Sequence, residues 1–138
     1  SRLFDKVIVA ILKNTDKSPF FNSQQRLAMI KNSVDQDLPN VRVDTFGGLL
    51  VEYALRHNAQ VIIRGIRAVS DYEYELQMAL MNRRMEPQIE TVFMMPAEAY
   101  SYLSSRLVRE IFQLGGSVSG LVPPHVEKEL GKRLVQKL

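Results

Sequence analysis

Two arginines flank a short turn directly after a run of β-branched residues, where Val61-Ile62-Ile63 is followed by Arg64-Gly65-Ile66-Arg67. The apolar run is typical of a buried strand, and the pattern from Ser70 to about Met85 predicts a helix. In an open α/β sheet, ligands bind beyond the carboxyl ends of the strands. Guanidinium groups are costly in a core and well suited to gripping phosphate. The turn is therefore a candidate anion site, although a local salt bridge from Arg67 to Asp71 could account for one arginine.

Three other polar or glycine-rich segments also follow predicted strands. Lys17 lies in the loop after a strand that ends at Leu12, and it could equally be a solvated loop lysine. The segment Gly47-Gly48-Leu49-Leu50 either lets the backbone approach a ligand closely or forms an ordinary turn. The segment from Tyr100 to Arg106 opens a helix, whose free amides and hydroxyls could bind an anion, unless Ser104 merely caps it. In a parallel sheet these loops lie along one rim.

The elements that would position these segments alternate along the chain. We expect strands over residues 6–12, 41–46, 61–63 and 91–95, and helices over 49–57, 70–85, 104–114 and 125–138. A further helix starts after Asn22, with Gln25 as its capping-box partner. Residues 1–5 resemble the last turn of a helix. This alternation predicts an α/β fold, a doubly wound, Rossmann-like parallel sheet in a single domain over residues 1–138.

Composition narrows the partners. The 138 residues are 46% hydrophobic and 24% charged, contain no cysteine and carry a formal charge of +3. The sequence contains no block of Lys and Arg residues that would indicate a nucleic-acid partner. No apolar run approaches the ~20 residues of a membrane span, so we expect a cytoplasmic protein. His57 and His125 are isolated, which predicts solvated helix residues and no paired-histidine metal site. Dinucleotide, Walker and zinc-protease motifs are absent from the sequence.

The chain resembles the bacterial phosphopantetheine adenylyltransferases, which are nucleotidyltransferase-superfamily enzymes of coenzyme A synthesis. The resemblance covers essentially the whole chain and is specific over residues 63–75, at Met81-Asn82-Arg83 and over residues 100–110. It implies transfer of adenylyl from ATP to 4′-phosphopantetheine, giving dephospho-coenzyme A and pyrophosphate, with Mg²⁺ as the cofactor. It also implies a homo-oligomer, typically a hexamer, that responds to coenzyme A as a feedback ligand.

The resemblance assigns roles to individual residues. Lys17, Leu50 and Arg64 would contact phosphopantetheine. ATP would be held by Gly65, Ile66, Arg67, Glu75, Tyr100, Ser101, Tyr102, Leu103, Ser104, Ser105 and Arg106. Lys17 and Arg67 would be the catalytic residues, with Lys17 bridging the nucleophile and the α-phosphate while Arg67 takes the β- and γ-phosphates. Glu75 would accept a ribose hydroxyl. A phosphate nucleophile is already ionised, so positioning and charge stabilisation suffice without a general base.

The sequence departs from the family pattern in two places. Arg106 stands where the family usually has a third serine. The family's opening strand and its loop P-G-[ST]-F-D-P-x-T-x-G-H, with a histidine that stabilises the transition state, do not occur in the 138 residues. We therefore expect a fold without the N-terminal strand, two exposed sheet edges and little or no activity in the 138-residue form. The alternatives are a superfamily nucleotidyltransferase with another acceptor, or a non-catalytic module that binds ATP or coenzyme A.

Overall fold

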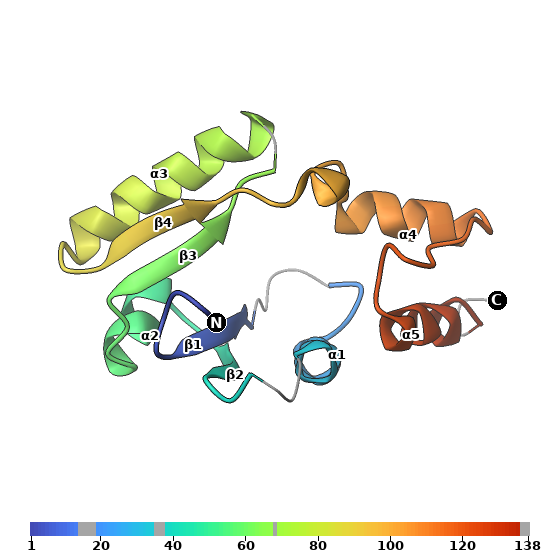
Figure 1. Cartoon of the computed structure of the whole chain (residues 1–138), viewed down its shortest axis with the longest axis horizontal. Coiled ribbons are helices and arrows are strands. Elements are labelled where there is room, and N and C mark those ends of the chain that lie inside the picture. Colours follow the sequence, from blue (N-terminus) through green and yellow to red (C-terminus); the bar gives the residue numbers. More distant parts are fainter. Residues whose placement is uncertain (14–18, 35–37, 68, 136–138) are drawn as a thin grey trace. The chain divides into compact units, whose positions relative to one another are not determined.

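The chain alternates strands and helices, as the sequence predicts. The structure is a computed structural model that describes residues 1–13, 19–34, 38–67 and 69–135. In chain order the helices and strands are β1 (Val7–Leu12), α1 (Ser23–Ser33), β2 (Val41–Phe46), α2 (Leu50–Arg56), β3 (Val61–Gly65), α3 (Val69–Met85), β4 (Glu90–Met94), the short 3₁₀ helix η1 (Glu98–Tyr100), α4 (Ser105–Gln113) and α5 (Pro124–Val135) (Figure 1). The α/β class with parallel pairing is confirmed.

The residues group into two compact units. The first unit contains residues 1–47 and 105–138, and the second contains residues 48–104. Strands β1 and β2 pair in the first unit, and strands β3 and β4 pair in the second. The prediction of a single domain stays a prediction.

The first unit is built on the β1–β2 pair. The strands run parallel, with Val7 opposite Val41 and Leu12 opposite Phe46, and α1 packs on both. Arg26 of α1 donates from Nη2 to the carbonyl of Leu12 at 3.1 Å. This bond ties the helix to the carboxyl end of β1.

The predicted capping box of α1 is confirmed. The Asn22 side chain accepts from the Gln25 amide at 2.8 Å, and the Gln25 side chain accepts from the Asn22 amide at 3.0 Å. Two amides that the first turn leaves unpaired are thus satisfied, which fixes where α1 begins.

Helices α4 and α5 share a hydrophobic core in the first unit. Val108, Val118 and Leu130 are its buried residues, and the Phe20–Phe21 pair packs against them. Helix α4 stops where Gly115 takes a φ of +83°, which a glycine adopts without the strain of a Cβ. The predicted stop at Gly115-Gly116 is therefore confirmed.

Both histidines have neighbours that the sequence did not indicate. His125 places Nε2 2.9 Å from the carbonyl oxygen of Met29 and 3.2 Å from the hydroxyl of Ser33, so it joins α5 to α1. The centre of the His57 ring lies 4.3 Å from the centre of the Tyr53 ring. The prediction of solvated helix residues is wrong for His125, because helical spacing shows which face a residue occupies but not which helix covers it.

Residues 1–5 are not the end of a helix. They form a turn, in which the side-chain amide of Asn40 donates to the carbonyls of Ser1 and Phe4 at 2.8 and 2.9 Å. An amide from the loop before β2 thus satisfies backbone groups that the sequence alone suggested were helical. That expectation is corrected.

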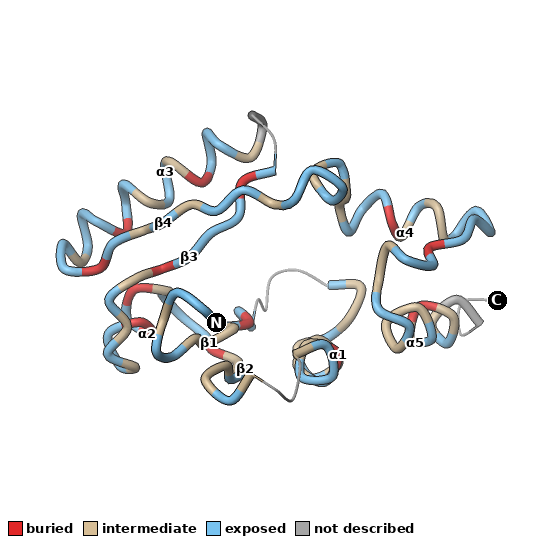
Figure 2. Tube along the Cα trace, viewed as in Figure 1, coloured by how far each residue is buried: buried red, intermediate tan, exposed pale blue. Residues whose placement is uncertain are grey.

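The second unit has a β3–α3–β4 crossover. Val61 lies opposite Glu90 and Gly65 opposite Met94 in a parallel register, and α3 packs against β4 and α2. Val51, Ala54, Ile62 and Ile89 form its core. Figure 2 shows α3 as mostly exposed, with buried positions only at intervals. No helix among the described residues is long and apolar enough to cross a membrane.

Candidate functional site

Arg64 and Glu75 form a bidentate ion pair at the carboxyl end of β3. Nε of Arg64 lies 2.7 Å from Oε2 of Glu75, and Nη2 lies 2.5 Å from Oε1. The Glu75 side chain is only 11% exposed, whereas the Arg64 side chain is 44% exposed. The hydrogen bonds that Arg64 donates to Glu75 raise the pKa of Arg64 above its ordinary value; desolvation opposes this rise, and the charge of Glu75 adds to it. The pair is therefore anchored on α3 and open to solvent on the arginine side.

Arg67 connects the turn to two other segments of the second unit. Its Nε lies 3.1 Å from Oδ2 of Asp71, one helical turn away, as the sequence suggested. Its Nη1 donates to the carbonyl of Leu103 at 2.6 Å. The structure thus brings together two of the segments expected to hold ATP, the turn after β3 and the stretch that ends at Ser104.

The residues between the two arginines contribute through their backbone. Ile66 is buried, and its amide donates to the carbonyl of Met94 at 3.1 Å. Gly65 is exposed at the end of β3, and a Cβ there would come no closer than 4.0 Å to that carbonyl. The Ile66 side chain therefore fixes the turn and is not available to a ligand.

The segment before α4 is compact and ordered by local bonds. It begins with η1, after which the Ser101 hydroxyl donates to the carbonyl of Glu98 at 2.8 Å. The Leu103 amide donates to the carbonyl of Tyr100 at 3.1 Å. Tyr100 and Tyr102 are 56% and 64% exposed, which leaves both rings free to stack on a planar group such as a base.

Two further residues, Leu50 and Lys17, were predicted to contact 4′-phosphopantetheine. Leu50 is the first residue of α2 and packs against the core of the second unit. Gly48, two residues earlier, has a φ of +84°. Lys17 lies outside the described residues.

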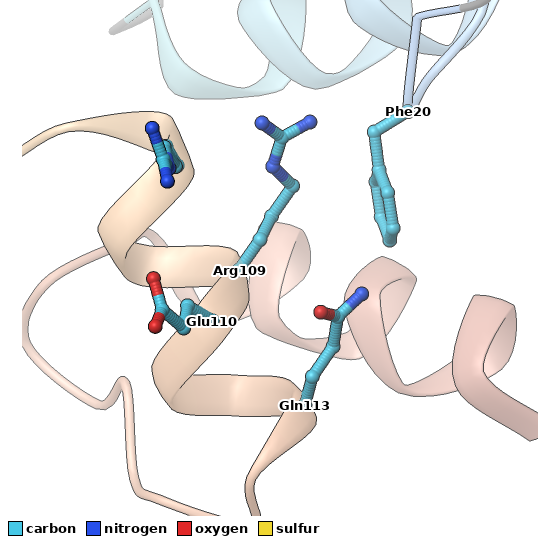
Figure 3. Close-up of a pocket in the computed structure, with 5 residues that line it drawn as sticks. Phe20, Arg109, Glu110 and Gln113 are labelled. Carbon is cyan, nitrogen blue, oxygen red and sulfur yellow. The ribbon is translucent and has the colours of Figure 1, made fainter.

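Arg106 belongs to a cationic cavity in the first unit. The cavity has a volume of about 360 Å³ and is lined by Phe20, Arg106, Arg109, Glu110 and Gln113. Figure 3 shows Arg109, Glu110 and Gln113 projecting from α4, with Phe20 facing them. Nε of Arg109 donates to the Ser105 carbonyl at 2.9 Å, while Arg106 makes no ion pair with any described residue. An anion could therefore find free guanidinium donors here.

Of the five residues that line this cavity, only Arg106 was predicted from the sequence as a site residue. The Arg109 guanidinium carbon lies 5.6 Å from the centre of the Phe20 ring, and that of Arg133 lies 5.1 Å from it. Such contacts are cation–π interactions. The spacing of Arg106 and Arg109 placed both on one side of α4, but nothing local in the sequence indicated that Phe20 would pack beside them.

The candidate site offers cationic guanidinium groups at the carboxyl end of β3. No group of three or more His, Cys, Asp or Glu side chains lies together among residues 1–13, 19–34, 38–67 and 69–135. Carboxylate clusters hold divalent cations in all-protein sites, whereas Mg²⁺ in phosphoryl chemistry is commonly carried by the substrate's phosphates. This donor set suits phosphate oxygens.

The fold is parallel α/β with two arginines beyond the end of a strand, and the comparisons specify the class of protein. Residues 1–111 match the family described as Cytidylyltransferase-like. Phosphopantetheine adenylyltransferase from Nostoc punctiforme is 55% identical over 130 residues, covering 94% of this chain and 70% of the relative. The protein of the same name from Caldanaerobacter subterraneus subsp. tengcongensis is 53% identical over 130 residues, covering 94% of this chain and 81% of the relative. The chain belongs to the phosphopantetheine adenylyltransferase family.

Proposed function

We propose that this chain transfers the adenylyl group of ATP to 4′-phosphopantetheine, giving dephospho-coenzyme A and pyrophosphate. Two relatives at 53% and 55% identity that carry the corresponding name support the assignment. The observation that carries it is the arginine turn after β3, where Arg64 is anchored by Glu75 and Arg67 reaches the carbonyl of Leu103. Guanidinium groups at this rim suit two phosphate-bearing substrates.

The two arginines serve different substrates in this proposal. Arg64, with Leu50 and Lys17, contacts 4′-phosphopantetheine. Arg67 takes the β- and γ-phosphates of ATP, and Glu75 accepts a hydroxyl of its ribose. The exposed rings of Tyr100 and Tyr102 lie in the segment assigned to ATP. The other residues proposed to hold ATP are Gly65 and Ile66 in the turn after β3 and residues 101–106, among which Arg106 supplies a further cation.

The reaction requires no general base. The acceptor's phosphate is ionised at neutral pH, so one of its oxygens attacks the α-phosphorus directly. The bond from the α-phosphorus to the oxygen that bridges to the β-phosphate breaks, and pyrophosphate leaves with the electron pair. Lys17 and Arg67 stabilise the charge that develops on the phosphate oxygens, and binding energy aligns the two reactants. In this scheme catalysis is mainly positioning and electrostatics.

Mg²⁺, feedback, assembly and location belong to the same proposal. Mg²⁺ would be supplied with ATP and would neutralise part of the charge on its phosphates. Coenzyme A, which contains the pantetheine arm and an adenosine phosphate, is the proposed feedback ligand. Exposed Met and Tyr side chains on α3 support a homo-oligomer, with a hexamer as the expected size. The reaction is placed in the cytoplasm, where ATP is plentiful.

A pyrophosphate-release assay tests the proposal. It uses the protein as the cell produces it, including any residues that flank these 138, with MgATP and 4′-phosphopantetheine. Release should require the acceptor's phosphate, so pantetheine should give none. Arg64→Ala should raise the KM for 4′-phosphopantetheine about tenfold or more, by loss of a charge-assisted contact. Arg56→Ala, an exposed arginine at the end of α2, is the matched control and should change little.

Other outcomes identify the alternatives. Product from a different phosphorylated acceptor would assign a related nucleotidyltransferase activity. ATP or coenzyme A binding by calorimetry, with no product from any acceptor, would indicate a binding module.

A further inference from the structure

The Arg64–Glu75 pair joins the two proposed ligand sites into one hydrogen-bonded unit. Glu75 uses both carboxylate oxygens to fix Nε and Nη2 of Arg64, at 2.7 and 2.5 Å. The two N–H groups on Nη1 of Arg64 are bonded to none of the described residues. Each Glu75 oxygen has a second lone pair and can still accept a hydroxyl. The unit can therefore bind a phosphate at one end and a ribose hydroxyl at the other.

We infer that Glu75 positions Arg64 for the acceptor phosphate, so that each substrate's affinity depends on the residue that contacts the other substrate. This inference rests on the proposed function. Glu75 acts on the acceptor without touching it, as a positioning residue. In the same way, Arg64 positions the Glu75 carboxylate that accepts a ribose hydroxyl of ATP.

Burial shows which partner anchors the pair. Glu75 is one of two buried polar residues in the described chain, the other being Asn82 on the same helix. The Arg64 side chain is 44% exposed and extends from the last part of β3. A half-exposed arginine without a partner samples many rotamers, and fixing it on binding costs conformational entropy. The anchored carboxylate removes most of that cost before the ligand arrives.

A second effect has the opposite sign and must be weighed against the first. The Glu75 carboxylate repels an anionic acceptor, so removing its charge would by itself tighten phosphate binding. The guanidinium lies between the carboxylate and the ligand and is largely in solvent, where Coulomb interactions are screened. A bidentate, charge-assisted geometry is the stronger term. Loss of the pair should therefore weaken acceptor binding.

The neighbouring Arg67–Asp71 pair provides a matched control. It joins residues one helical turn apart, with Arg67 42% and Asp71 28% exposed. Arg67 also has the Leu103 carbonyl as a partner at 2.6 Å. Disrupting this pair should change the affinity for ATP and leave the affinity for 4′-phosphopantetheine nearly unchanged.

The test measures the affinity of each substrate separately by calorimetry, using the protein as the cell produces it. Glu75→Gln keeps the size of the side chain and one acceptor oxygen but removes the ion pair. This substitution should weaken the affinity for 4′-phosphopantetheine about three- to tenfold, which is the cost of fixing one free arginine side chain. Arg64→Ala should weaken the affinity for ATP about two- to fivefold. Asp71→Asn should leave the affinity for 4′-phosphopantetheine within about twofold of the wild-type value. In the Arg64→Ala background, Glu75→Gln should no longer weaken the affinity for 4′-phosphopantetheine.

A ligand-independent measurement tests the pair itself. Phenylglyoxal modifies free guanidinium groups, and peptide mass spectrometry gives the rate at each arginine. In Glu75→Gln the rate at Arg64 should rise several-fold, while the rate at Arg67 stays the same. This readout requires no substrate and is independent of the proposed reaction.

Three results would overturn the inference. In the first, Glu75→Gln leaves acceptor affinity unchanged or tightens it. In the second, the two substitutions add independently in the double variant. In the third, the Arg64 modification rate does not change, so that the pair is absent in solution. Failure of the proposed function would be distinguishable: the wild-type protein would bind neither substrate, while Glu75→Gln would still raise the Arg64 modification rate.

Discussion

At the scale of single residues, the two arginines of one turn have different anchors. Arg67 pairs with Asp71 at the i,i+4 spacing of a helix, a contact that the sequence pattern indicated. Arg64 pairs with Glu75, which is eleven residues away and separated by a turn. A local pattern could not show that contact, because it depends on how α3 packs against the sheet. Both arginines are thus partly satisfied, and the free donors on each define what remains for a ligand.

Arg67→Ala should raise the KM for ATP about tenfold while changing the KM for the acceptor little. The variant loses a phosphate-binding cation and also the bond to the Leu103 carbonyl that holds the segment before α4. Steady-state kinetics with each substrate varied in turn measure both effects. Arg67→Lys is the informative comparison, because an ammonium retains the charge but lacks the separate Nε and Nη1 donors that bond Asp71 and the Leu103 carbonyl. Equal effects on both substrates would contradict the division of the arginines.

The Arg64–Glu75 pair should contribute the same stability from neutral to alkaline pH. Glu75 raises the pKa of Arg64, so the arginine's contribution is fully present below the ordinary guanidinium pKa and is lost only above the raised one. The difference in free energy of unfolding between wild type and Glu75→Gln should therefore stay flat from about pH 7 to pH 10. Urea denaturation at each pH measures it. A difference that shrinks over this range would mean that another group titrates in the pair.

At the scale of elements, the starts and ends of helices are set by particular residues. Asn22 and Gln25 start α1, and Gly115 ends α4, as their sequence patterns predict. Such signals are local, which is why the sequence locates these boundaries well. Contacts between helices are not local, and the bond of His125 to Met29 could not be predicted from either helix alone.

Gly48→Ala should lower the free energy of unfolding by about 1–2 kcal/mol, the cost of a left-handed backbone for a residue with a Cβ. Its φ is +84°, while an added Cβ would meet nothing closer than a Glu52 oxygen at 3.8 Å. The cost is therefore conformational rather than a clash. Gly47→Ala is the matched control, because nothing lies within 4 Å of its Cβ position and its φ is not positive. Similar losses in both variants would contradict this explanation.

His125→Ala should destabilise the first unit by about 1–2 kcal/mol, since it leaves the Met29 carbonyl with one donor fewer and removes the link between α5 and α1. Thermal unfolding followed by circular dichroism measures the loss. Ser33→Ala, which removes a hydroxyl bonded to the same carbonyl, should cost less, because the histidine remains in place. A silent His125→Ala would show that the two helices are held by apolar packing alone.

At the scale of the whole molecule, the sequence predicts the class of fold better than its connectivity. Alternating apolar runs and amphipathic segments indicated a parallel α/β protein, because period and breakers are local. Within the two units, β1 pairs with β2 and β3 pairs with β4, both in parallel. Strand neighbours depend on long-range pairing, which no single segment encodes. The same limit applies to the site, where the turn after β3 was predictable and the cavity around Phe20 was not.

The exposed side of α3 carries the last prediction, which concerns assembly. Tyr74, Met78, Met81 and Met85 are spaced by four, three and four residues, and all are exposed, at 63%, 37%, 53% and 41%. This spacing makes one apolar stripe along the helix, of the kind that a partner helix covers. Contiguous exposed apolar patches of this kind mark interaction surfaces. In the proposed homo-oligomer we expect a second copy of the chain to cover the stripe.

Met81→Glu should therefore shift the protein toward smaller species, because burying an unpaired carboxylate in an apolar interface is costly. Size-exclusion chromatography with light scattering measures the mass of each species. Leu114→Glu is the matched control: Leu114 is 82% exposed and lies beyond the end of α4, so its charge should leave the assembly intact. An unchanged oligomer in Met81→Glu, or equal dissociation in both variants, would place the interface elsewhere than on the α3 stripe.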